Sequence, residues 1–118
     1  METREAIMAF SQSEKIKAGL IWVSQSLEHL RGVPDVERKV AERFTGALLG
    51  MVGHEVSLAK AVAGGAGWDE ITDYIDKADI MVHSGVGHEA ISHISQALSR
   101  VTTIGQQSMT SLKESGLL

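Results

Sequence analysis

Residues 16–30 read IKAGLIWVSQSLEHL. Apolar side chains recur in this stretch at alternating spacings of four and three residues, at Ile16, Leu20, Val23, Leu27 and Leu30. This spacing places them on one face of an α-helix. The same period continues backward through Ala6, and it predicts one helix from about Glu2 to Arg31. A helix that starts afresh near Ser13 is the alternative.

A turn separates this first helix from a second apolar pattern. Residues 32–35 read GVPD, in which the glycine is suited to end a helix and the proline to start one. The second pattern then runs through Val40, Phe44, Ala47, Met51, His54, Leu58 and Ala61. We expect this stripe to face the core, and we expect the helix to end in the AGGAG run of residues 63–67.

Two further apolar patterns fill the rest of the chain. The first begins after Trp68 and runs through Ile71, Ile75, Ala78 and Val82. The second runs through Ile91, Ile94, Leu98, Val101, Gly105, Ser108 and Leu112. The two stripes are out of phase, and glycines lie at their junction. Residues 69–114 therefore form either two helices or one long helix with a kink or break near residues 84–87, because two interior glycines cost only about 2 kcal/mol relative to alanine.

These patterns predict an all-α fold, an up-and-down helical bundle of three long or four helices in a single domain over residues 1–118. The composition agrees, since 43% of the residues are hydrophobic, only 4% are aromatic and there is one proline. A core of Leu, Ile, Val, Met and Ala suits helix packing, whereas sheets are richer in aromatic residues and threonine. The length is sufficient for one hydrophobic core.

Charge and residue usage disfavour several classes of function. The formal net charge is −4, and the 11 basic residues are scattered among 15 acidic ones, which disfavours nucleic-acid binding. Cysteine is absent, so disulfides, thiolate zinc sites and cysteine catalysis are excluded. No apolar run approaches the ~18 residues of a membrane span, and no signal-peptide core follows the first residues. We expect a cytoplasmic protein that binds neither nucleic acid nor membrane.

The tetrapeptide VGHE occurs twice, at residues 52–55 and 86–89, and it is the main candidate for chemistry. Histidine and glutamate side chains that project from facing helices form metal sites in helical bundles. Neutral imidazole with carboxylate suits divalent zinc, iron, manganese or nickel. A metal or cofactor site of this kind would use His54, Glu55, His88, Glu89 and His93.

A structural role for the His–Glu pairs is the favoured interpretation. Adjacent helical residues point about 100° apart, so one His–Glu dipeptide rarely turns both groups toward the same ion. The Glu-x-x-His spacing of dinuclear carboxylate bundles is absent, and no serine lies in a Gly-x-Ser-x-Gly context. We expect histidines that hydrogen-bond glutamates of neighbouring helices, and we expect no enzymatic activity.

Small and aromatic residues mark the candidate interaction surfaces. The small ones are Gly46, Gly50, Gly53 and Ser57. They fall on one strip of the second helix, where another backbone can approach closely. Trp22 and Trp68 flank the predicted core, and each is suited to anchor an interface. We predict a non-catalytic interaction or scaffold module that self-associates, most simply as a homodimer, with a second protein as a further candidate partner.

Overall fold

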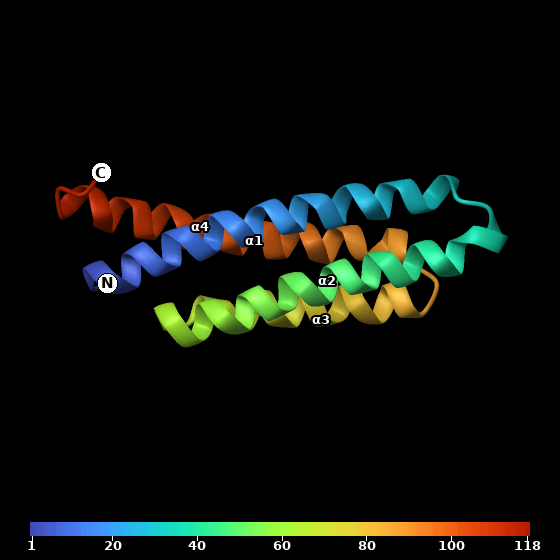
Figure 1. Cartoon of the computed structure of the whole chain (residues 1–118), viewed down its shortest axis with the longest axis horizontal. Coiled ribbons are helices and arrows are strands. Elements are labelled where there is room, and N and C mark those ends of the chain that lie inside the picture. The colour runs from blue at the N-terminus through green and yellow to red at the C-terminus, as the bar shows by residue number, and fades with distance from the viewer.

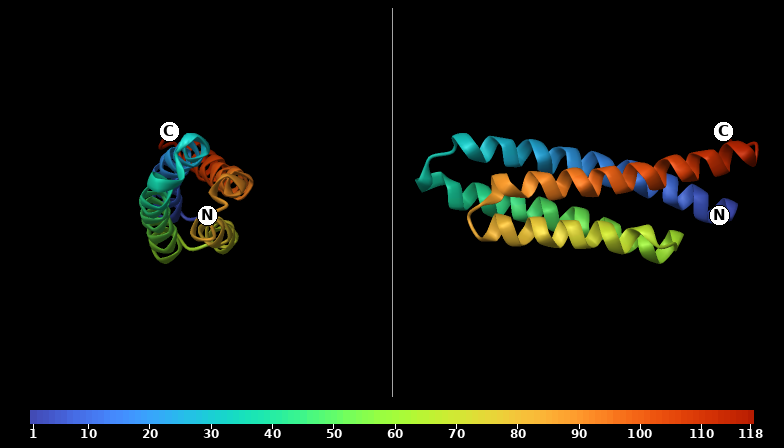
Figure 2. Two further views of the ribbon diagram at one scale, coloured as in Figure 1. Left: turned by 90° about the vertical axis from the view of Figure 1, so that its right-hand side faces the viewer. Right: turned by 180° about the vertical axis from the view of Figure 1, so that it is seen from behind.

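The computed structural model describes all 118 residues and contains four α-helices and no strand. The helices are α1 (Thr3–His29), α2 (Asp35–Ala63), α3 (Gly67–His83) and α4 (Ile91–Glu114), with short 3-10 turns η1 (Leu30–Gly32) and η2 (Gly87–Ala90). They run up and down in a bundle of 54 × 21 × 18 Å (Figure 1). α1 packs on α2 and α4, and α3 packs on the same two helices, so the end-on view in Figure 2 is roughly square. The predicted all-α bundle is confirmed, and it has four helices.

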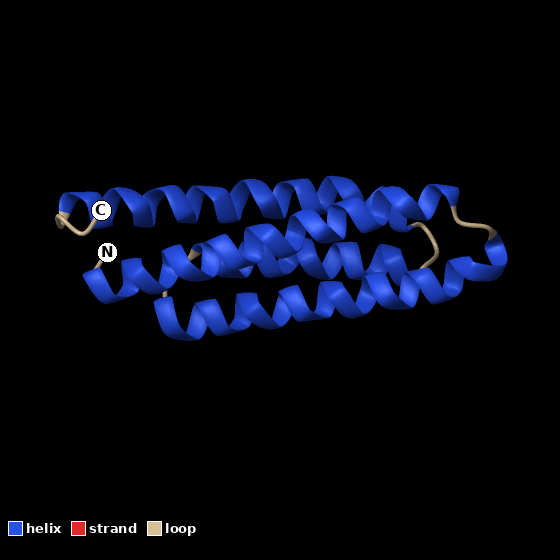
Figure 3. Ribbon diagram, turned by 45° about the horizontal axis from the view of Figure 1, so that its top comes forward, coloured by secondary structure: helices blue, strands red, loops and turns tan.

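The connections between the helices are short (Figure 3) and have local causes in the sequence. Pro34 precedes α2 with a φ of −60°, a value that suits a helix entry. Gly64 follows α2 with a φ of 67°, in the left-handed region that favours glycine. The Trp68 indole then donates a 2.8 Å hydrogen bond to the Gly64 carbonyl and closes the α2–α3 turn. α3 begins slightly earlier than predicted, at Gly67.

Residues 69–114 form two helices, with the break where the sequence placed it. Gly85 has a φ of 81°, which ends α3 because side-chain-bearing residues rarely adopt that conformation. Gly87 is buried beneath the end of α1, and a Cβ at this position would lie 2.9 Å from Leu30 Cδ1. The junction therefore needs one glycine for its backbone conformation and the other for close packing.

The predicted stripes of α1 and α3 lie in the core, and that of α4 lies largely there. All five residues from Ile16 to Leu30 that follow the four-three spacing are buried, the last of them in η1, as are the four predicted α3 residues. In α4 most of the predicted stripe is buried, while Ile91 and Leu98 pack half-buried against the core. α1 is continuous through Ser13, which is itself buried, so the alternative helix start at that residue is wrong.

The predicted core stripe of α2 is wrong. Its residues are exposed, and we call them the outer stripe: Val40, Phe44, Ala47, Met51, His54, Leu58 and Ala61. The buried residues of α2, here called the inner stripe, are Thr45, Leu49, Val52, Val56, Ala59 and Ala63. Both stripes have the same four-three spacing, and they lie on nearly opposite faces of the helix. Periodicity alone therefore does not distinguish them.

Contact with α1 accounts for which stripe of α2 is buried. Gly19 of α1 makes room for Val52, because a Cβ at position 19 would lie 2.8 Å from Val52 Cγ2. The hydroxyls of Ser26 and Thr45 form a 2.7 Å hydrogen bond in the same helix contact. Small and β-branched side chains of the inner stripe allow this close approach, whereas Phe44 and other long side chains of the outer stripe would hold the helices apart.

Candidate interaction surface

The outer stripe and Trp22 of α1 leave a large apolar surface in water. The exposed fractions are 52% for Val40, 74% for Phe44, 66% for Met51, 42% for Leu58 and 61% for Trp22. With residue areas of about 150–250 Å², these five side chains expose about 550 Å² together. That value lies at the upper end of the range for the largest apolar patch on a monomeric protein, and patches of this size are often binding sites.

The surface is continuous along α2. Trp22 and Met51 line one groove between α1 and α2, of about 170 Å³, together with Leu48. Val40 and Phe44 line the next hollow along the same helix, with other residues of α2. The apolar surface therefore follows α2, with Trp22 on its α1 side. Leu48 was not predicted as part of this surface, although it directly follows Ala47 of the outer stripe in the sequence.

The four small residues of α2 divide into two groups. Gly46 lies against His83 of α3, because a Cβ at this glycine would lie 3.3 Å from the His83 Cε1 atom. Gly53 lies against Ile75 of α3, where a Cβ would lie 3.7 Å from the Ile75 Cγ2 atom. A Cβ at Gly50 would meet no atom within 4 Å, and Ser57 is exposed. Two members thus lie in the α2–α3 contact, and the other two border the outer stripe.

The two tryptophans have different surroundings. Trp68 is only 2% exposed and belongs to the core at the α2–α3 turn, so its prediction as an interface residue is wrong for this chain. Its indole hydrogen bond to Gly64 gives the residue a structural role. Trp22 has most of its surface in solvent. Of the two, Trp22 alone is available to a partner.

The two VGHE segments do not meet within the chain. His54 is exposed on the outer stripe of α2, whereas His88 lies in η2 and lines a pocket with Arg38. At 1.5 Å per helical residue, Arg38 is about 24 Å from His54 along α2. No group of three or more histidine, aspartate or glutamate residues lies close enough to hold a metal ion. The chain therefore does not gather the five hypothesised ligands.

Glu55 is held by α1. The Gln12 Nε2 atom donates to the Glu55 carboxylate at 3.0 Å and to its main-chain carbonyl at 3.2 Å, and the Lys15 ammonium lies 3.3 Å from the same carboxylate. The hydrogen bond from Gln12, followed by that from Lys15, lowers the pKa of Glu55 below its usual value of 4.5. The expected hydrogen bonds between histidines and glutamates of neighbouring helices do not include Glu55, because its partners are these two residues of α1.

The two histidines on either side of the second VGHE segment, His83 and His93, each contact a residue of α3. The His93 ring stacks on Tyr74 of α3, with 6.4 Å between ring centroids and 29° between planes. Glu89 is exposed in η2. The His83 Nδ1 atom lies 2.9 Å from the Asp79 carbonyl oxygen. The first contact joins α4 to α3, and the second lies within the last turn of α3.

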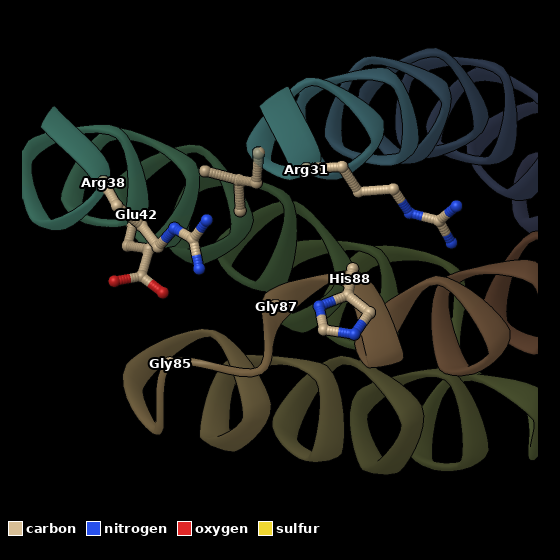
Figure 4. Close-up of a pocket in the computed structure, with 7 residues that line it drawn as sticks. Arg31, Arg38, Glu42, Gly85, Gly87 and His88 are labelled. Carbon is tan, nitrogen blue, oxygen red and sulfur yellow. The ribbon is translucent and has the colours of Figure 1, made fainter. Parts of the chain in front are cut away.

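A pocket of about 270 Å³ lies at the end of the bundle where η1 and η2 meet (Figure 4). Its polar side chains are those of Arg31, Arg38, Glu42 and His88. The Arg31 side chain extends away from Arg38 and Glu42 in the close-up, and Arg38 Nη2 donates to the Val33 carbonyl at 3.2 Å. Because these groups do not converge on one point, the pocket does not form a built ligand site.

The comparisons with known proteins do not add a family to these observations. A scan against protein-family models, a search of curated proteins and a search of solved structures each found no match to this chain. No helix combines the length and the apolar character needed to cross a membrane. The function is therefore inferred from the geometry of the outer stripe.

Proposed function

We propose that this chain is a non-catalytic protein–protein interaction module that self-associates through the outer stripe of α2 and Trp22. The observation that carries the proposal is that α2 is apolar on two nearly opposite faces, of which only the inner stripe is buried. An amphipathic surface helix has one apolar stripe, whereas a helix that is apolar on more than one side is typical of a buried position.

The size of the surface supports association. Covering about 550 Å² on each of two partners would release roughly 25 kcal/mol of hydrophobic free energy. That exceeds the cost of about 4–15 kcal/mol for lost translation and rotation, before side-chain ordering is counted. Aromatic residues and methionine are enriched at interfaces. Phe44, Met51 and Trp22 are the three most exposed of the five large apolar side chains of this surface.

The non-catalytic part of the proposal is supported by the partners of the titratable side chains. Glu55 is held by Gln12 and Lys15, and the His93 ring stacks on Tyr74. These groups link one helix to another and so have a structural function. A general base or nucleophile needs a neighbour that activates it and a place for substrate beside it.

Sedimentation velocity tests the proposal. At micromolar concentration the chain should sediment as a multiple of 12.7 kDa, and Met51→Glu should give a monomer with unchanged helical circular dichroism. Ile80→Glu is the matched control, because Ile80 is also 66% exposed but lies on α3 outside the outer stripe. A monomeric parent chain would refute the proposal. So would a control substitution that weakens association as much as Met51→Glu.

A further inference from the structure

We infer that the occupant of the outer stripe is a second copy of this chain, whose α2 packs antiparallel to this α2 about a two-fold axis near residues 48–50. The inference rests on the proposed function and specifies its partner and orientation. The arrangement places Val40 opposite Leu58 of the second copy, Phe44 opposite His54, and Ala47 opposite Met51. These pairs follow from the spacing of the outer stripe once the axis lies near residues 48–50, the position that pairs every member of the stripe from Val40 to Leu58.

The shapes of the paired side chains are complementary. Alternating spacings of three and four residues make the outer stripe a seam of the kind that interlocks two helices in a coiled coil. In the two layers beside the axis, the long Met51 side chain of one copy meets the small Ala47 of the other. The Phe44 ring meets the His54 imidazole, which provides an aromatic partner for the polar member of the stripe. Each central layer thus joins one copy's residue to a different residue of the other copy.

Charge distinguishes this orientation from the parallel one. Glu37 occupies the next position of the seam toward the start of α2, and the antiparallel arrangement places it opposite Ala61. A parallel arrangement would place Glu37 against Glu37 and His54 against His54, and it would also align the dipoles of the two helices. The antiparallel pair has no like charges in contact along the seam.

The residues beside the axis fit close approach. Gly50 borders the outer stripe and faces open space, so two backbones can come together at this point. A two-fold axis perpendicular to the helices keeps the α1 side of one copy next to the α1 side of the other. Trp22, which shares its groove with Leu48 and Met51 near the middle of the stripe, would then cover the corresponding groove of the second copy.

The area available matches what a stable dimer needs. The five large exposed side chains provide about 550 Å², and the exposed Ala47, His54, Ala61 and Gly50 add to this value. The total approaches the ~800 Å² per partner that a standard interface buries. An anionic membrane surface is a poorer occupant, because the chain carries a net charge of −4 and Glu37 continues the stripe.

Disulfide trapping tests the orientation, and the chain is suited to it because it contains no cysteine. Val40→Cys and Leu58→Cys each place one thiol at an exposed position, so neither substitution disturbs the core. In the antiparallel pair, two copies of position 40 lie about 27 Å apart along the helices. A disulfide requires Cα atoms within about 7 Å.

Oxidation of an equimolar mixture of the two variants should therefore give the mixed disulfide, in at least about tenfold excess over either homodisulfide. Mass spectrometry identifies the products, and Ile80→Cys mixed with Leu58→Cys serves as the control that should remain uncrosslinked. Val40→Cys homodisulfides would indicate the parallel pair and overturn the inference.

The failure of this inference is separable from the failure of the proposed function. A dimer that Met51→Glu disrupts but that forms no mixed disulfide would overturn the orientation, while self-association through the outer stripe stands. A monomer by sedimentation would overturn both. If the Met51→Glu variant still dimerises, the outer stripe is not the interface, and the proposed function and the antiparallel orientation are both refuted.

Discussion

The contact between α1 and α2 at Gly19 predicts that Gly19→Ala destabilises the parent protein but stabilises a variant in which Val52 is truncated. A Cβ at position 19 would lie 2.8 Å from Val52 Cγ2. Val52 is buried and β-branched, so its methyl group has little freedom to move away. Replacing glycine by alanine inside a helix gains about 1 kcal/mol, whereas an added methyl in a packed contact costs about 1–3 kcal/mol. We expect Gly19→Ala to lower the free energy of unfolding by about 1 kcal/mol.

Truncation of Val52 should reverse this effect. Val52→Ala removes the methyl group that the new Cβ would meet and leaves a small cavity. In that background Gly19→Ala keeps its helical gain and fills part of the cavity, so it should raise the free energy of unfolding by about 1 kcal/mol. The coupling between the two substitutions is then about 2 kcal/mol, which is within the range found for residues in contact.

Urea unfolding followed by circular dichroism measures all four proteins of the cycle, at a protein concentration low enough to keep them monomeric. Gly50→Ala is the matched control, because a Cβ at that position meets no atom within 4 Å and should stabilise the helix by about 1 kcal/mol in both backgrounds. If Gly19→Ala stabilises the parent and the Val52→Ala variant equally, α1 and α2 do not touch at this point. The assignment of the inner stripe to the core would then fail, and the outer stripe would lose its status as a free surface.

Further predictions concern pH, metal and fluorescence. Since Gln12 lowers the pKa of Glu55, the ionised carboxylate stabilises the fold above pH 4.5 and this stabilisation is lost as pH falls through the folded-state pKa. Gln12→Ala should therefore make the free energy of unfolding fall less steeply between about pH 5 and pH 3, and an unchanged slope would contradict the contact. Chelation with EDTA should leave the Tm unchanged because the five hypothesised metal ligands lie apart, whereas a lowered Tm would favour a metal-binding protein. Acrylamide quenching of tryptophan fluorescence should weaken as protein concentration rises, because dimerisation covers Trp22 while Trp68 is already buried. Trp22→Phe should abolish that dependence, and its persistence would place the interface away from Trp22.

The fold was predictable from sequence wherever a helix has one apolar face. α3 is such a case, since Ile71, Ile75, Ala78 and Val82 are its only regular stripe and all four are buried. α2 has two stripes of equal period, and the choice between them depends on Gly19 and Ser26, which belong to another helix. Spacing reports which residues share a face, but it does not report which neighbour that face will meet.

The repeated VGHE tetrapeptide illustrates why the candidate site was less predictable. The first copy lies within α2, and the second passes through the turn that ends α3 and enters η2. Gly85, with its φ of 81°, precedes the second copy and reverses the chain there. The glutamate of the first copy is bonded by Gln12, which lies 43 residues away in the sequence. Identical local sequence therefore has different surroundings, because those surroundings come from distant segments.

The residue types of the two α2 stripes separate them where periodicity does not. The inner stripe includes Thr45, Ala59 and Ala63, whose short side chains let helices approach in a bundle only 18–21 Å across. The outer stripe includes Phe44 and Met51, which are long and are among the residue types enriched at interfaces between proteins. When one helix carries two apolar stripes, the stripe of smaller side chains is the better candidate for the core of a narrow bundle. The stripe of larger side chains is then the better candidate for a surface that a second copy covers.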